Sequence, residues 1–260
     1  MILAQAIARF LERSGLIDST VNPEPRALVH QRSLSLLTEY FPTDATLHDV
    51  TPSILRDLVS RWYIEGASAS PQNTFISLES RAISKESRTT DTLNSHHSDH
   101  IPEPRDLLSS LEEFFKWADQ QTGPGQYAEL SSILIELGQT LPRAMEITDA
   151  LTNALRERGG AFTFPEFLTS FEEGGSSQYD IDAPGNAGAI DGYLRIIRVE
   201  GTFVEAEELI SEERVWPIIF PREAAALVKA GYILSLELIR DAQGWQIAAC
   251  GFAYPPGTQI

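Results

Sequence analysis

Apolar residues recur at helical spacing through the first 158 residues of the chain. In the first such segment, Leu3, Ile7 and Phe10 fall on one face, as expected of an amphipathic helix. Thr51 followed by Pro52 is a favourable helix start, because threonine caps the first turn and proline lacks an N–H that would stay unpaired there. The predicted helices are about 2–14, about 25–41, one from Pro52, one from Pro104, one from near Tyr127, and one from the turn Gly138–Pro142 to Gly159. This pattern predicts an all-α domain over 1–158.

Residues 67–102 interrupt the helical pattern. They are rich in Ser and Thr and poor in apolar residues, which predicts a flexible insertion. Within them Arg81, Lys85 and Arg88 follow the spacing i, i+4, i+7, so a helix formed here would carry them on one edge. A solvated loop with incidental charges is the simpler interpretation.

After residue 160 the pattern becomes that of short strands. Residues 159–191 are rich in Gly, Ser and Asp and are predicted to form a linker. In 192–260, five strands and one short helix from Arg222 are predicted, with a glycine-containing hairpin turn at 241–244. The strands are expected at 193–199, 202–209, 215–220, 232–239 and 245–254. Five short strands favour a small antiparallel β-barrel, SH3-like or OB-like, because closure removes unpaired edges. The expected fold class is α+β with two domains.

Charge and composition limit the partners that we expect. The chain has 260 residues, a net charge of −17 at pH 7 and a pI near 4.6. Acidic residues exceed basic ones in both halves, which disfavours nucleic acid, because affinity for phosphates depends on Lys and Arg. No apolar run reaches the ~20 residues of a membrane helix, and the N-terminal stretch is interrupted by charges, unlike a signal peptide. A single cysteine, Cys250, fits a reducing compartment. We therefore expect a cytoplasmic protein with no membrane partner.

Motifs for bond-breaking chemistry are missing from the sequence. It has no G-x-S-x-G elbow, H-E-x-x-H zinc motif or phosphate-binding loop. Cys250 lies among small residues of a predicted strand and is expected in the core. A hydrolase would need His30 or His48 within hydrogen-bond reach of a nucleophile in a pocket.

The run His-His-Ser-Asp-His at 96–100 offers ligand types that suit a transition metal. It lies in the predicted insertion, where ordering the backbone would cost about 1–2 kcal/mol per residue, so a polar linker is the favoured interpretation. We expect no cofactor, no metal site and no enzymatic activity.

The helical segment resembles a known family in two places. L-H-D-V-T-P at 47–52 precedes Leu55, Leu58 and Trp62, and a later helix contains F-F-K-W-A at 114–118. This order is similar to the core-binding domain of tyrosine recombinases (phage integrases) over about residues 25–155, apart from 67–102. The resemblance implies a SAM-like helical bundle, which in that family closes over one side of DNA. The family's catalytic domain has no counterpart, because the chain lacks an H-x-x-R motif and all five histidines precede residue 101.

We therefore expect a non-catalytic two-domain interaction protein whose partner is another protein. The alternative is a DNA-binding accessory factor that contacts phosphates through five basic residues. These are Arg56, Arg61, Arg81, Lys85 and Arg88. A second candidate is a groove on the barrel lined by aromatic residues, although packing in the core is the simpler role for them. These are Trp216, Tyr232, Trp245 and Tyr254.

Overall fold

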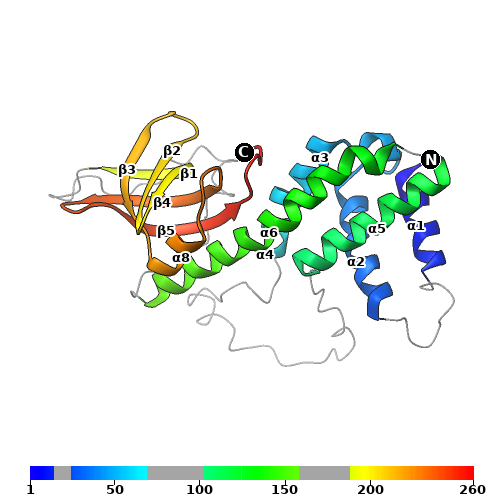
Figure 1. Ribbon diagram of the computed structural model, residues 1–260, viewed down its shortest axis with the longest axis horizontal. Coiled ribbons are helices and arrows are strands. Elements are labelled where there is room, and N and C mark those ends of the chain that lie inside the picture. Colours follow the sequence, from blue (N-terminus) through cyan, green and yellow to red (C-terminus); the bar gives the residue numbers. More distant parts are fainter. Residues whose placement is uncertain (15–24, 69–101, 124, 158–187) are drawn as a thin grey trace, which may run out of the picture. The chain divides into compact units, whose positions relative to one another are not determined.

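The computed structural model describes residues 1–14, 25–68, 102–123, 125–157 and 188–260. The fold is α+β, with helices in the N-terminal two-thirds and a five-stranded sheet at the C-terminal end (Figure 1). Two compact units are present: one comprises Met1–Leu58 with Trp62–Ser131, and the other comprises Val59–Arg61 with Ser132–Ile260. Almost all of the predicted insertion (67–102) and linker (159–191) lies outside the described residues.

The helices of the first unit lie close to their predicted positions. Thr51 accepts a hydrogen bond from the Ile54 N–H, and Pro52 occupies the first turn, as the sequence predicts. None of the helices in the described residues is long and apolar enough to cross a membrane. The elements are α1 (Leu3–Arg13), α2 (Pro25–Tyr40), a 3-10 turn (Leu47–Asp49), α3 (Pro52–Asp57), a π-helical segment (Leu58–Trp62), α4 (Tyr63–Ser68) and α5 (Pro104–Thr122).

Helices α1, α2 and α5 pack against one another and enclose an aromatic core. Phe10 of α1 meets Phe114 of α5 edge to face, with ring centroids 5.6 Å apart, and lies 5.7 Å from the Trp117 ring. Such aromatic pairs add to the stabilisation that burial alone provides. The buried rings of Phe114, Phe115 and Trp117 of α5 thus supply the centre of this core.

The long helix α6 (Gln126–Glu157) corrects the prediction of two helices separated by a turn at 138–142. Pro142 lies inside the continuous helix. Proline removes one backbone hydrogen bond there. The uninterrupted apolar stripe explains why the helix continues, since its members are all buried and keep a spacing of three or four residues. They are Leu130, Leu134, Leu137, Leu141, Ala144, Ile147, Leu151 and Leu155.

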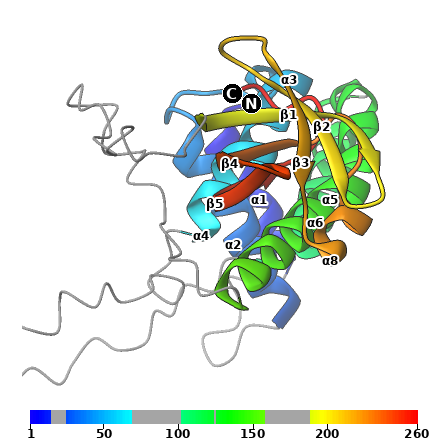
Figure 2. The ribbon, with the colours of Figure 1, turned by 90° about the vertical axis from the view of Figure 1, so that its left-hand side faces the viewer.

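Five strands and helix α8 (Arg222–Leu227) follow, close to the predicted positions (Figure 2). Their order is β1-β2-β3-β5-β4, and β4 pairs with β1 so that the order closes on itself. Gly201, with φ 63°, stands in the tight turn between β1 and β2. The strands are β1 (Ala189–Glu200), β2 (Phe203–Glu208), β3 (Arg214–Ile219), β4 (Ile233–Asp241) and β5 (Gly244–Tyr254).

The pairing of β3 with β5 corrects the prediction of an antiparallel barrel. Ile218 pairs with Trp245 and Ile219 with Gln246 in parallel, whereas the other four strand pairs are antiparallel. Strand direction cannot alternate around a closed ring of five, because five is odd. One pair must therefore be parallel, and here it is the short contact that closes the ring.

Most of α6, from Ser132 onward, belongs to the unit that contains the sheet, so the compact units divide near the start of α6 and not at the predicted residue 158. Ile147, Leu151 and Leu155 are buried in one core with residues of the strands. The Thr148 hydroxyl also accepts a hydrogen bond from the Ala253 N–H of β5 at 2.9 Å. This helical segment is therefore part of the sheet's hydrophobic core.

Candidate functional site

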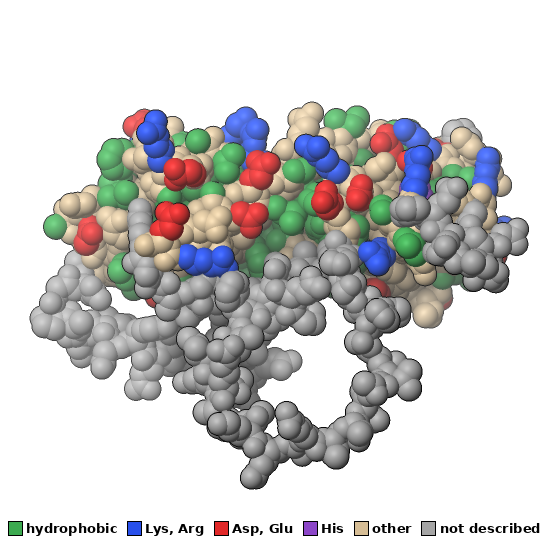
Figure 3. All heavy atoms as spheres, turned by 90° about the horizontal axis from the view of Figure 1, so that it is seen from below, with side chains coloured by type: hydrophobic (Ala, Val, Ile, Leu, Met, Phe, Trp, Pro, Cys, Tyr) green, Lys and Arg blue, Asp and Glu red, His purple; other side chains and the backbone are tan. Residues whose placement is uncertain are grey.

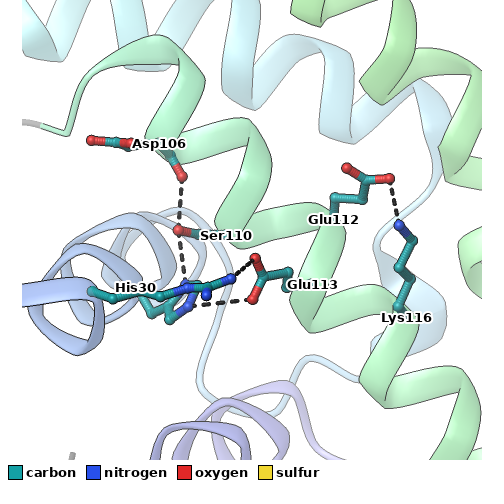
Figure 4. Close-up of polar contacts among 7 residues, drawn as sticks. His30, Asp106, Ser110, Glu112, Glu113 and Lys116 are labelled. Atoms are coloured by element: carbon teal, nitrogen blue, oxygen red, sulfur yellow. Dashed lines mark hydrogen bonds and ion pairs between the residues drawn. The ribbon is translucent and has the colours of Figure 1, made fainter. Parts of the chain in front are cut away.

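His30 of α2 lies within hydrogen-bond reach of a hydroxyl group, as the hydrolase hypothesis would require (Figure 4). Its Nδ1 is 3.0 Å from Ser110 Oγ of α5, and its Nε2 is 3.5 Å from Glu113 Oε2 of the same helix. Arg26 holds the other oxygen of that carboxylate at 2.5 Å. A hydroxyl, an imidazole and a carboxylate in sequence are the groups of a hydrolytic triad.

The surroundings of Ser110 are those of a structural contact. The residue is 0% exposed, so its oxygen has no path to a substrate. Its hydroxyl donates to the Asp106 carbonyl oxygen one turn earlier at 2.7 Å, which leaves the oxygen to accept from His30 Nδ1. The cluster therefore ties α2 to α5, and its arrangement supports a packing role.

The environment of His30 favours the neutral imidazole. Burial lowers the pKa of His30, the nearby Glu113 carboxylate opposes this effect, and the Arg26 guanidinium adds to it. An edge contact with Phe10, at 5.5 Å between ring centroids, completes the apolar side of the site. The neutral ring fits because a buried charge costs free energy unless it is fully paired.

The basic residues of the DNA hypothesis are only partly described. Arg56 on α3 and Arg61 in the π-helical segment are half-buried, and both take part in interactions within the chain. Arg81, Lys85 and Arg88, together with the histidine-rich run 96–100, lie outside the described residues. On the face shown in Figure 3, Lys and Arg side chains lie scattered among Asp and Glu.

The four aromatic residues of the predicted groove do not share one surface. Tyr232 and Tyr254 are buried, and the Tyr232 hydroxyl donates to the Thr140 carbonyl oxygen of α6 at 3.3 Å. Trp245 is half-buried at the start of β5, where the Arg240 guanidinium lies 5.6 Å from its ring centroid. Trp216 on β3 is 40% exposed. Of the four, Trp216 alone is exposed enough to present its ring to a partner.

Trp216 belongs to a surface cluster that the sequence analysis missed. Phe203 of β2 is 44% exposed and meets Trp216 at 6.4 Å between ring centroids, while the Arg198 guanidinium of β1 lies 5.2 Å from the Trp216 ring centroid. Glu205 of β2 joins the two arginines, because its carboxylate lies 3.2 Å from Arg198 and 3.3 Å from Arg214. We call Arg198, Phe203, Glu205, Arg214 and Trp216 the aromatic–arginine patch.

The alternation of buried and outward-facing residues along β2 indicates two members of this patch. Phe203 and Glu205 have the same phase along β2, opposite to the buried Val204 and Ala206, so both face outward. The cross-strand neighbour of Glu205 is Arg198, and that register depends on the turn at Gly201. The sequence therefore marks the outward residues, whereas their contact across strands requires the register.

Cys250 and the potential metal ligands do not form a reactive site in the part of the chain that is described. Cys250 is buried, as predicted, and burial raises the pKa of its thiol to about 11, which disfavours the reactive thiolate. Among the described residues, no group of three or more His, Cys, Asp or Glu side chains is arranged to hold a metal ion. Comparison with protein-family models, with curated proteins and with solved structures finds no significant match.

Proposed function

We propose that this chain is a non-catalytic interaction protein that binds another protein through the aromatic–arginine patch. The observation that carries the proposal is the exposed contact between Trp216, Phe203 and Arg198 on adjacent strands. Trp and Arg are the residues most often responsible for binding energy in protein interfaces. The ion pairs of Glu205 hold both arginines in place before binding, which reduces the entropy lost on association.

The size of the expected effect follows from the exposure of Trp216. A tryptophan of this kind contributes 150–250 Å² when fully buried, so covering the exposed 40% removes roughly 60–100 Å² from water. At about 25 cal/mol per Å² this gives about 2 kcal/mol, the size of an interface hot spot.

The charges around the patch favour a protein over nucleic acid. Arg198 forms ion pairs with both Glu200 and Glu205, and Arg214 forms one with Glu205. These carboxylates neutralise the arginines that would otherwise attract phosphates, and the whole chain carries −17. The alternative is a DNA-binding accessory factor. It draws support from the position of the patch on β2 and β3, because the surface of strands 2 and 3 binds oligonucleotides in OB-folds.

We also propose that the sheet is OB-like. The spatial order β4-β1-β2-β3 is that of a Greek key, and the OB-fold is a five-stranded Greek-key barrel. In OB-folds the surface of strands 2 and 3 binds oligonucleotides and oligosaccharides, which supports a binding role for the patch but not the choice of a protein partner.

For the helical unit we propose the SAM-like bundle of the tyrosine recombinase core-binding domain. The residues that carry the resemblance act here as a helix cap and as core, since Thr51 caps α3 and Phe114, Phe115 and Trp117 are buried. Lys116, the charged residue of that segment, forms an ion pair with Glu112 at 2.7 Å. Support therefore comes from the order of the motifs and not from a DNA-facing surface.

The experiment places a photo-crosslinking phenylalanine analogue at position 203 of the full chain. The purified chain is then mixed with an extract of the cells from which this protein comes and is irradiated. The crosslinked protein is identified, purified and titrated by calorimetry. We expect Trp216→Ala to weaken binding at least about tenfold, whereas the control Ile239→Ala, which changes an exposed residue of β4 outside the patch, leaves affinity unchanged.

Equal affinity of Trp216→Ala and the wild type would refute the proposal. In a parallel measurement, fluorescence polarisation with single- and double-stranded oligonucleotides is recorded over a series of salt concentrations. Binding that weakens steeply with salt and disappears in Trp216→Ala would replace the protein partner by DNA.

A further inference from the structure

The loop between β2 and β3 presents an exposed apolar side chain on a fixed backbone. Ile210 is 82% exposed, more than any other large hydrophobic residue in the described parts of the chain. A single exposed isoleucine on a surface is ordinary and needs no explanation. Ile210 differs from such a residue because specific hydrogen bonds fix the loop that carries it.

Glu208, at the end of β2, fixes the loop with its side chain. Although the residue is buried, its carboxylate accepts hydrogen bonds from the N–H groups of Ile210, at 3.1 Å, and Ser211, at 2.5 Å. Burial alone would raise the pKa of Glu208, but hydrogen bonds from the Ser211 hydroxyl and from these N–H groups outweigh it and lower the pKa. The carboxylate thus stays charged and keeps both backbone bonds.

The neighbouring strand makes room for this carboxylate. A Cβ atom at Gly192 of β1 would lie 3.1 Å from Glu208 Oε1, so a glycine at this position lets the carboxylate lie against the strand. The Leu209 N–H donates to the Tyr193 carbonyl oxygen at 2.9 Å and anchors the loop to β1. Two strands therefore support one short loop.

The rest of the loop is also fixed. Glu212 adopts the left-handed conformation with φ 56°, which a residue other than glycine rarely does, and the Glu213 N–H donates to Ser211 Oγ at 3.3 Å. Strained positions of this kind persist only where the surroundings hold them, and they concentrate at functional sites. Because the loop is already ordered, little entropy would be lost when it binds.

We propose that residues 209–213 form a second docking element, in which Ile210 enters an apolar pocket of a partner protein whose rim carries Lys or Arg. The exposed carboxylates of Glu212 and Glu213 flank Ile210 and set the charge of that rim. A nucleic acid or an anionic membrane would be repelled by the same carboxylates. This inference rests on the proposed function, because it assumes a protein partner, but it concerns a different surface.

The experiment places the photo-crosslinking residue at position 210 of the full chain, with position 239 as a control and position 203 in parallel. We expect a crosslink from 210 to a protein segment with apolar residues flanked by Lys or Arg. With that protein purified, Ile210→Ser weakens binding at least about tenfold, and replacing both Glu212 and Glu213 with Gln flattens the salt dependence. Glu208→Gln, which removes one backbone acceptor while Ile210 stays, weakens binding several-fold while the unit that contains the sheet remains folded at the assay temperature.

Three results would overturn the inference: no crosslink at 210 above the control at 239, a crosslink to nucleic acid or to a second copy of the chain, or equal affinity of Ile210→Ser and the wild type. A crosslink from 203 without one from 210 refutes this inference and leaves the proposed function standing. The reverse result refutes the role of the aromatic–arginine patch and keeps the loop. Crosslinks from neither position refute both.

Discussion

The position of α6 in the core of the sheet predicts that a fragment starting at residue 159 does not fold. Such a fragment contains all five strands but lacks the buried side chains of Ala144, Ile147, Leu151 and Leu155. A fragment 132–260 keeps them and corresponds to the second compact unit apart from 59–61. The two fragments differ only in the segment 132–158, so their comparison isolates the contribution of the helix.

The magnitude follows from burial. Ile147, Leu151 and Leu155 are 0–4% exposed, and burying each such side chain is worth about 1.5–3 kcal/mol. Together they contribute about 5–9 kcal/mol, which equals much of the total stability of about 5–15 kcal/mol typical of a domain. We therefore expect 132–260 to unfold cooperatively on heating and 159–260 to be unfolded or molten at room temperature.

Circular dichroism during thermal unfolding distinguishes the two outcomes, with far-ultraviolet and near-ultraviolet signals recorded together. Point variants of the full chain give a matched check on the same helix. Leu151→Ala is expected to lower stability by about 2–5 kcal/mol, whereas Ile135→Ala, at a position 63% exposed, changes it by less than about 0.5 kcal/mol. A cooperative transition of 159–260 at the same temperature as 132–260 would refute the assignment of α6 to this core.

Three further predictions concern the helical unit. Burial lowers the pKa of His30 below 6.5, so the unfolded state binds more protons than the folded state. The contribution of His30 to stability is therefore complete above about pH 6.5 and is lost as the pH falls toward the folded pKa. The variant His30→Asn, which can still donate to Ser110, is expected to reduce the loss of melting temperature between about pH 7.5 and 5. A steeper loss in the variant would contradict this sign. Thr51→Ala removes the cap on the Ile54 N–H and lowers stability by about 1 kcal/mol in urea unfolding; no change would show that the 3.4 Å contact is not a cap. The Ser33 hydroxyl is buried with no hydrogen-bond partner among the described residues, so Ser33→Ala is expected to raise stability by about 1 kcal/mol, and a loss would reveal a partner.

Local patterns were enough to place most elements of the fold. The cap at Thr51 and the turn at 241–244 each depend on residues adjacent in sequence, and the structure has both. The turn predicted at Gly138–Pro142 was wrong for a related reason. Gly and Pro are local signals, but the burial of Leu137, Leu141 and Ala144 on one face is a tertiary effect that outweighs them.

Contacts between residues that are far apart along the chain could not be predicted from the sequence alone. His30 and Ser110 are 80 positions apart, and nothing in either segment marks them as neighbours until α2 is packed on α5. The aromatic–arginine patch could be predicted in part. Strand alternation places Phe203 and Glu205 on the outward face, but their proximity to Arg198 depends on the strand register.

The division between the two units shows why a change in sequence pattern is a poor marker of a boundary. The pattern changes from helical spacing to strand alternation after residue 160, and a boundary at 158 follows if each unit contains one kind of element. A closed sheet of five short strands has a small interior, and its hydrophobic core is larger when another element packs against it. In this chain the element is the end of α6, whose apolar stripe runs on without a break from Leu130 to Leu155. The stripe is buried along its whole length, and its last four members, Ala144, Ile147, Leu151 and Leu155, lie in the core of the sheet, so the start of the strand pattern does not mark where that core begins.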